Sequence, residues 1–200
     1  MTNIIIFTIL CVGIISYLSS CKNKLKSKSD ESYISETGDT VKIHNLQDNQ
    51  YLGLRSMALN LTAEKLQITL PIDQIKVYGV VMDWDLGEGI ATFISFSTGD
   101  ASMYLSSGGG LIGGGQHENV SIAAKTFVDK AQLYLSKTNK IDSTPLPDKN
   151  CVRFYFLTNK GKYSAQDELK NFDNNTSIWL PLFNEGNKVI TELRLIQEKK

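Results

Sequence analysis

The chain has 200 residues, with 21 Lys and Arg against 21 Asp and Glu, 42% hydrophobic residues and three Cys. This length predicts a single folded domain. A net charge of zero argues against a nucleic-acid-binding protein, which usually carries a basic excess. Three Cys are too few for a disulfide framework. We therefore expect one globular domain with no nucleic-acid partner, no cofactor and no structural metal.

The first twenty residues carry no charged side chain, and a nearly apolar run extends from Ile4 to Leu18. A helix over this run would rise about 22 Å, which is less than the roughly 30 Å hydrocarbon core of a bilayer. The run therefore fits the hydrophobic region of a signal peptide, over residues 1–20, better than a spanning helix.

The sequence Leu18-Ser19-Ser20-Cys21 ends this run and resembles the lipobox of bacterial lipoproteins. In a lipobox, an aliphatic residue and two small residues precede the Cys whose thiol receives the lipid. The resemblance implies cleavage before Cys21, which then bears the lipid anchor, with palmitate among its acyl groups. It also implies a domain outside the cytoplasm, at the cell membrane or the outer membrane, and a partner among the proteins of the cell envelope.

An uncleaved membrane anchor is the alternative, because the residues before the apolar run include no Lys or Arg. Four lysines follow the run instead, at Lys22, Lys24, Lys26 and Lys28. For an uncleaved anchor, the positive-inside rule would place the rest of the chain in the cytoplasm. The mass of the mature protein distinguishes the two cases.

Residues 21–50 are polar and lack a helical apolar pattern, so we interpret them as a flexible tether. A coil of this length spans roughly 30 Å, enough to hold a domain clear of lipid headgroups. The lysines of this segment could instead add attraction to anionic lipids. The folded domain is then expected over residues 51–200.

Residues 51–61 predict a helix, with Leu54, Met57, Ala58 and Leu61 on its apolar face. Three strands are expected next, and because only short turns join them, they must be antiparallel. A long helix, one strand with a short return strand and a final helix complete the order. The expected strands are residues 75–83, 90–97, 101–107, 152–158 and 163–165. The second helix is expected over residues 119–136, and the third begins near residue 178.

These elements predict an α+β fold with a four- to five-stranded, mainly antiparallel sheet packed with helices, in the order α-βββ-α-β(β)-α. In broad outline this order resembles the profilin and roadblock type of α/β sandwich, which implies no function. The stretch from Val77 to Glu118 is similar to segments of uncharacterised bacterial proteins. That similarity covers residues 55–196 in outline and implies a single domain only.

The glycine-rich segment between the third strand and the next helix has two interpretations. As a ligand-binding loop, it would hold an anion or a carboxylate on backbone N–H groups at the start of the helix. It lacks the Lys of a phosphate loop and the βαβ context of a dinucleotide site. In the steric interpretation, glycine lets the backbone pass closely against the sheet. The ligand-binding residues of the first interpretation are Gly108, Gly109, Gly110, Gly113, Gly114, Gly115 and His117.

A small hydrolase is the alternative function to a binding domain. It would use His117 with Glu118 and either Asp83 or Asp85, and it requires these side chains to converge. In the non-catalytic interpretation, His117 is an exposed loop residue and Glu118 is an acid at the helix N-terminus. The two aspartates are then hairpin-turn acids. The sequence contains no Gly-x-Ser-x-Gly motif, and its second His is at position 44, within the expected tether. We expect a domain that binds rather than catalyses.

Cys151 stands at the start of an expected strand and has no Cys partner in the folded part of the chain. We interpret it as a small apolar core residue, because a catalytic Cys needs a neighbouring His and an electropositive setting.

Overall fold

The computed structural model describes residues 44–198. The expected signal peptide, the expected lipobox and most of the expected tether therefore lie outside the described residues. A seven-stranded sheet forms the centre of the domain, in the order β4-β3-β2-β1-β6-β7-β5, and each neighbouring pair is antiparallel. The strands are β1 (Val77–Asp85), β2 (Ile90–Phe96), β3 (Ala101–Leu105), β4 (Gly110–Leu111), β5 (Asn139–Ile141), β6 (Cys151–Thr158) and β7 (Gly161–Glu168).

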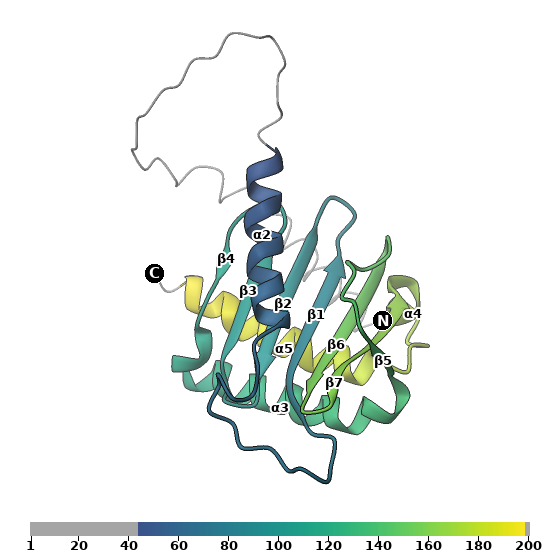
Figure 1. Cartoon of the computed structure of the whole chain (residues 1–200). Coiled ribbons are helices and arrows are strands. Elements are labelled where there is room, and N and C mark those ends of the chain that lie inside the picture. The colour runs from purple at the N-terminus through teal and green to yellow at the C-terminus, as the bar shows by residue number, and fades with distance from the viewer. Residues whose placement is uncertain (1–43, 199–200) are drawn as a thin grey trace, which may run out of the picture.

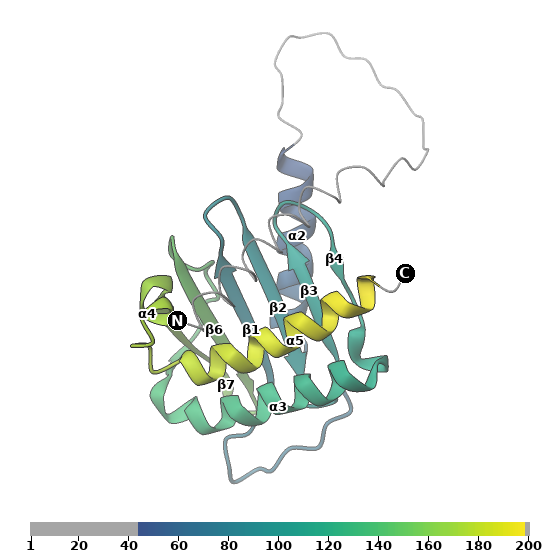
Figure 2. The ribbon, with the colours of Figure 1, turned by 180° about the vertical axis from the view of Figure 1, so that it is seen from behind.

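Helices cover both faces of this sheet (Figures 1 and 2). Helices α3 (Glu118–Tyr134) and α5 (Leu180–Glu198) lie together on one face, whereas α2 (His44–Leu59) crosses the other. Two 3-10 turns, η2 (Gly114–Gln116) and η3 (Leu135–Lys137), flank α3, and the short helix α4 (Leu169–Asp173) follows β7. The sheet is thus the middle layer of three.

Alternation along the strands produces two separate cores. In β1, Val80, Met82 and Trp84 contribute to the core under α3 and α5, whereas Val81 contributes to the core under α2. Successive side chains of a strand point to opposite faces of the sheet, so a strand that is apolar on both faces must be covered on both. The Trp84 ring meets Phe183 of α5 edge-on, with 5.1 Å between the ring centroids.

The α+β class is confirmed, but the sheet has seven strands rather than four to five. The short edge strands β4 and β5 were not expected, and β7 is longer than the expected range of 163–165. Strands β4 and β5 have two and three residues, too few for an alternating apolar pattern. They exist because β3 and β7 offer them a partner, which a local pattern does not reveal.

Helix α2 begins at His44, within the segment that we expected to be a tether. Its buried face is formed by Tyr51, Arg55, Ala58 and Leu59, whereas Met57 is 71% exposed. Of the expected apolar face, Ala58 is buried and Leu54 and Leu61 are partly buried against the core, so the expectation was wrong for Met57. The sequence pattern also did not reveal that a charged residue, Arg55, belongs to the buried face.

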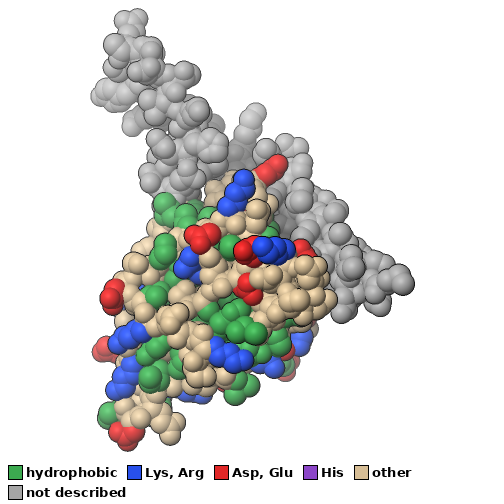
Figure 3. Space-filling model, turned by 90° about the vertical axis from the view of Figure 1, so that its right-hand side faces the viewer, with side chains coloured by type: hydrophobic (Ala, Val, Ile, Leu, Met, Phe, Trp, Pro, Cys, Tyr) green, Lys and Arg blue, Asp and Glu red, His purple; other side chains and the backbone are tan. Residues whose placement is uncertain are grey.

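Figure 3 looks onto the β5 side of the molecule, the right-hand side of Figure 1. Lys, Arg, Asp and Glu side chains alternate there with hydrophobic ones, and neither sign of charge gathers in one place. This distribution agrees with the zero net charge of the chain.

Asp167, near the end of β7, joins β7, α4 and the start of α5. Its carboxylate accepts hydrogen bonds from the Asn171 amide (2.6 Å), the Ser177 hydroxyl (2.6 Å) and the Glu168 backbone N–H (2.9 Å). Partial burial raises the pKa of Asp167, but these hydrogen bonds outweigh it, so the pKa lies below its ordinary value.

We expect the stabilisation from Asp167 to be lost at low pH. A carboxyl whose pKa is lower in the folded state stabilises the fold above its unfolded pKa, about 3.9, and that stability disappears as the pH falls through the folded value. Urea unfolding of the wild type and Asp167→Asn should differ at pH 7, and the difference should shrink as the pH falls below about 3.9. Asp173→Asn, at an exposed position in α4, is the matched control and should follow the wild type. A difference that stays constant with pH would contradict this role.

Candidate functional site

The glycine-rich segment turns back on β3 and leads into α3. The backbone of this segment forms hydrogen bonds within the domain. Gly108 N–H donates to Leu105 O (2.9 Å), and Leu105 N–H donates to Gly109 O (3.1 Å). Gly113, in the left-handed conformation with φ 73°, precedes η2. The segment is thus a structured connection between the sheet edge and the N-terminus of α3.

Three of these glycines are required by close packing. A Cβ atom at Gly110, Gly114 or Gly115 would lie within 2.6 Å of a neighbouring atom, closer than real Cβ contacts. The neighbours are the Met103 carbonyl oxygen, the Leu193 Cδ2 atom and the Asp100 Oδ1 atom, respectively. At Gly109 and Gly113 the space is open. Close packing therefore accounts for three of the six glycines, and positive φ angles account for the other three: Gly108 (98°), Gly109 (85°) and Gly113 (73°).

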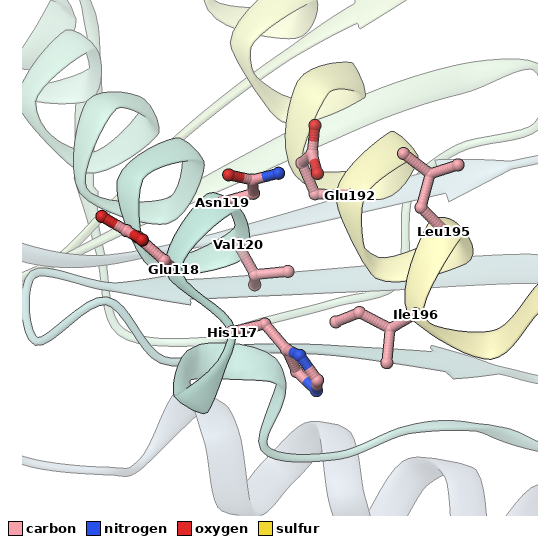
Figure 4. A pocket seen from close by; sticks show the side chains of 7 residues that line it. All are labelled: His117, Glu118, Asn119, Val120, Glu192, Leu195 and Ile196. Carbon is pink, nitrogen blue, oxygen red and sulfur yellow. The ribbon is translucent and has the colours of Figure 1, made fainter. Parts of the chain in front are cut away.

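A pocket lies where α3 begins and α5 ends (Figure 4). It has a volume of about 480 Å³ and is open to solvent on one side. Asn119 and Glu192 lie at one end of the view, and His117 and Ile196 at the other. The lining residues are His117, Glu118, Asn119, Val120, Glu192, Leu195 and Ile196.

This pocket combines an aliphatic wall with acidic and hydrogen-bonding groups. Val120, Leu195 and Ile196 form the wall, while Glu192 and Glu118 contribute carboxylates. Figure 4 shows the Glu118 side chain directed away from the other six, and the Glu192 side chain beside Asn119. Chemically, the arrangement suits a ligand with an apolar body and a positively charged or hydrogen-bond-donating end.

The structure does not bring Asp85 to His117. Asp85 accepts a hydrogen bond from the Gly87 N–H (2.7 Å) in the turn between β1 and β2, so it is the hairpin-turn acid that we expected. Gly115, two residues before His117, packs against Asp100 in the turn at the other end of β2. The seven residues of β2 separate the two turns by roughly 20 Å.

Asp83 is also separated from His117, because it is buried on the α2 face of the sheet. Its expected role as a turn acid was wrong: the residue lies within β1 and is 0% exposed. Its Oδ2 atom accepts hydrogen bonds from Arg55 Nε (2.8 Å) and Nη2 (2.6 Å), and its Oδ1 atom accepts one from the Thr92 hydroxyl (2.5 Å). The carboxylate is thus fully engaged inside the core.

Arg55 extends this buried polar cluster to the connector before β6. Its Nη1 and Nη2 atoms donate to the carbonyl oxygens of Thr144 and Pro145, each at 3.0 Å. The guanidinium carbon lies 5.4 Å from the ring centroid of Tyr155, whose hydroxyl also donates to Pro145 O. One arginine therefore fastens α2 to the central strand and to the connector.

Burial dominates the electrostatics of this cluster. It raises the pKa of Asp83, and the Arg55 guanidinium and the Thr92 hydroxyl oppose the rise. It also raises the pKa of Tyr51, whose hydroxyl lies 2.8 Å from the Thr92 hydroxyl, and the nearby Asp83 raises it further. The Asp83 carboxylate and the Arg55 guanidinium therefore compensate each other's charge, and their hydrogen bonds add to this stabilisation.

The sequence did contain a signal for this cluster. Asp83 directly follows the uncharged run Val77–Met82 and is flanked by Trp84, and Arg55 stands four residues after Tyr51 on one helix face. Lone charges in the core almost always have a partner. A search for a cation on the facing helix would have proposed Arg55.

Cys151 lies buried at the start of β6, as predicted, and burial raises the pKa of its thiol. Within residues 44–198, no group of three or more His, Cys, Asp or Glu side chains is placed to hold a metal ion. Over the same residues, no helix has the length and apolarity needed to cross a membrane.

The fold and site define an α+β domain whose antiparallel sheet is covered by helices on both faces, with a pocket at one corner. Comparison with protein-family models, curated proteins and solved structures finds no match to the chain.

Proposed function

We propose that this chain is a membrane-anchored lipoprotein whose folded domain binds a ligand or a partner protein in the cell envelope. The observation that carries the proposal is the lipobox Leu18-Ser19-Ser20-Cys21 at the end of an uncharged, apolar run. Acylation of Cys21 would hold the chain at the cell membrane or the outer membrane. The domain would then be joined to its anchor through α2, the first described helix.

We assign the binding surface to the corner where the glycine-rich segment meets α3. His117 lines the pocket there, and Gly109 and Gly113 leave open space beside their backbones. The separation of His117 from Asp83 and Asp85 favours binding over the hydrolase alternative, since proton transfer needs contacts of about 3 Å. Turnover by the purified protein that His117→Ala abolished would contradict the binding role.

We expect Cys21→Ser to abolish lipid attachment, because an alcohol does not replace the thiol that receives the lipid. Metabolic labelling with a fatty acid in a bacterial host, followed by membrane fractionation, measures both the label and the location. Cys151→Ser is the matched control, because Cys151 is buried in the domain and should not affect labelling. A Cys21→Ser variant as strongly labelled as the wild type would refute the lipoprotein assignment.

A further inference from the structure

The lining of the pocket between α3 and α5 is chemically complementary to a lysine side chain. Its seven lining residues include two glutamates and no Lys or Arg. The aliphatic wall suits the methylene stem of a lysine, and Glu192 suits its ammonium group.

We propose that this pocket is filled by a lysine of residues 22–28 of the same chain. This segment, Lys-Asn-Lys-Leu-Lys-Ser-Lys, carries four positive charges and one apolar residue, Leu25. The idea deepens the proposed function, since it names an occupant and regulator of the same binding corner. The contact itself does not require acylation of Cys21.

The length of the intervening chain permits this contact. Lys28 and His44 are sixteen residues apart in the sequence. At about 3.3 Å per residue, the intervening chain reaches roughly 50 Å when extended. A domain of this size has a radius of gyration near 15 Å, which corresponds to roughly 40 Å across. The segment can therefore reach the pocket from the start of α2.

Attachment to the same chain also offsets the modest depth of the pocket. A short flexible link gives the tethered segment an effective concentration in the millimolar range. A site that binds a free lysine-rich peptide only weakly would therefore be well occupied by its own segment. The high effective concentration favours the chain's own segment over a free basic partner.

For the lipidated protein, the contact would orient the domain. Lys22 directly follows Cys21, so an occupied pocket would bring the α3–α5 corner close to the acyl chains and the membrane surface. The segment would compete there with any other ligand of the pocket. The proposed binding site would thus be autoinhibited by the sequence that connects it to the anchor.

The experiment is zero-length carbodiimide cross-linking of the full chain in mild detergent, with mass spectrometry to locate the linked peptides. The reagent joins a carboxylate to a lysine amine that it contacts. We expect Glu192 of the monomer to link to Lys22, Lys24, Lys26 or Lys28. The yield should be several-fold above that of exposed Asp129 on α3 with the same lysines.

Two leucines on the surface provide matched variants. Leu195→Ala removes part of the pocket wall at a residue that is 42% exposed, so the fold should tolerate it, and we expect the link to fall several-fold. Leu133→Ala, on α3 and outside the pocket, should leave the yield unchanged. The Cys21→Ser variant should retain the link, which separates this proposal from the acylation test. A link that is absent from the monomer, confined to cross-linked dimers, or unaffected by Leu195→Ala would overturn the proposal.

Discussion

Replacing Arg55 with Met is expected to lower the free energy of unfolding by about 3 to 5 kcal/mol, as is typical when one partner of a buried ion pair is removed. Asp83 is 0% exposed, and the variant would leave its Oδ2 atom without either of its guanidinium bonds. The carbonyl oxygens of Thr144 and Pro145 would lose donors as well. Urea unfolding followed by circular dichroism measures the loss.

Asp83→Asn should be similarly destabilising, because it leaves Arg55 buried with a neutral partner. The double variant Arg55→Met/Asp83→Asn should lose less than the sum of the two single losses, since no uncompensated charge remains. Arg194→Met is a suitable control, because Arg194 lies on the surface of α5 and pairs with Glu198 only at 3.9 Å. It should cost less than about 1 kcal/mol. Single variants near wild-type stability, or strictly additive losses, would contradict a buried, coupled pair.

Gly110→Ala is expected to destabilise the domain by about 2 to 3 kcal/mol, in the range of overpacked sites. The added Cβ would lie 2.2 Å from the Met103 carbonyl oxygen, which belongs to the backbone of β3 and cannot rotate away. The variant must therefore separate β4 from β3 or distort the ladder between them. Urea unfolding gives the loss, and hydrogen exchange shows whether it is confined to this edge of the sheet.

Gly53→Ala is the matched control for the glycine-rich segment. Gly53 lies within α2, and a Cβ there would meet no atom within 4 Å. Alanine favours a helix over glycine by about 1 kcal/mol, so this variant should be slightly more stable than the wild type. If Gly110→Ala were as stable as the wild type, the segment would not be needed for packing, and the ligand-loop interpretation would gain support.

The longer elements could be predicted because their patterns are local. Strand β2 is Ile-Ala-Thr-Phe-Ile-Ser-Phe, and the structure places it at Ile90–Phe96, one residue shorter than expected. Helix α3 was predicted over 119–136 and is observed over Glu118–Tyr134, followed by the 3-10 turn η3. In each case neighbouring residues supply the periodicity that the element requires.

The candidate site was predicted less completely. His117 was correctly expected to be an exposed residue next to a helix start, but its pocket depends on Glu192, Leu195 and Ile196 of the last helix. These residues are more than seventy positions further along the chain. No local pattern places α5 beside the start of α3, because their packing depends on the core that both share.

Taken alone, the order of residues determined the α+β class and the antiparallel pairing of the first three strands, and it predicts the lipobox. Each of these depends on a short motif, a local period or a short turn. Only the tertiary structure decided that Asp83 pairs with Arg55 across 28 positions of sequence and lies far from His117. The physical reason is that burial removes a charge from water, and the partner that compensates it is selected by the packing of α2 on the sheet rather than by sequence distance.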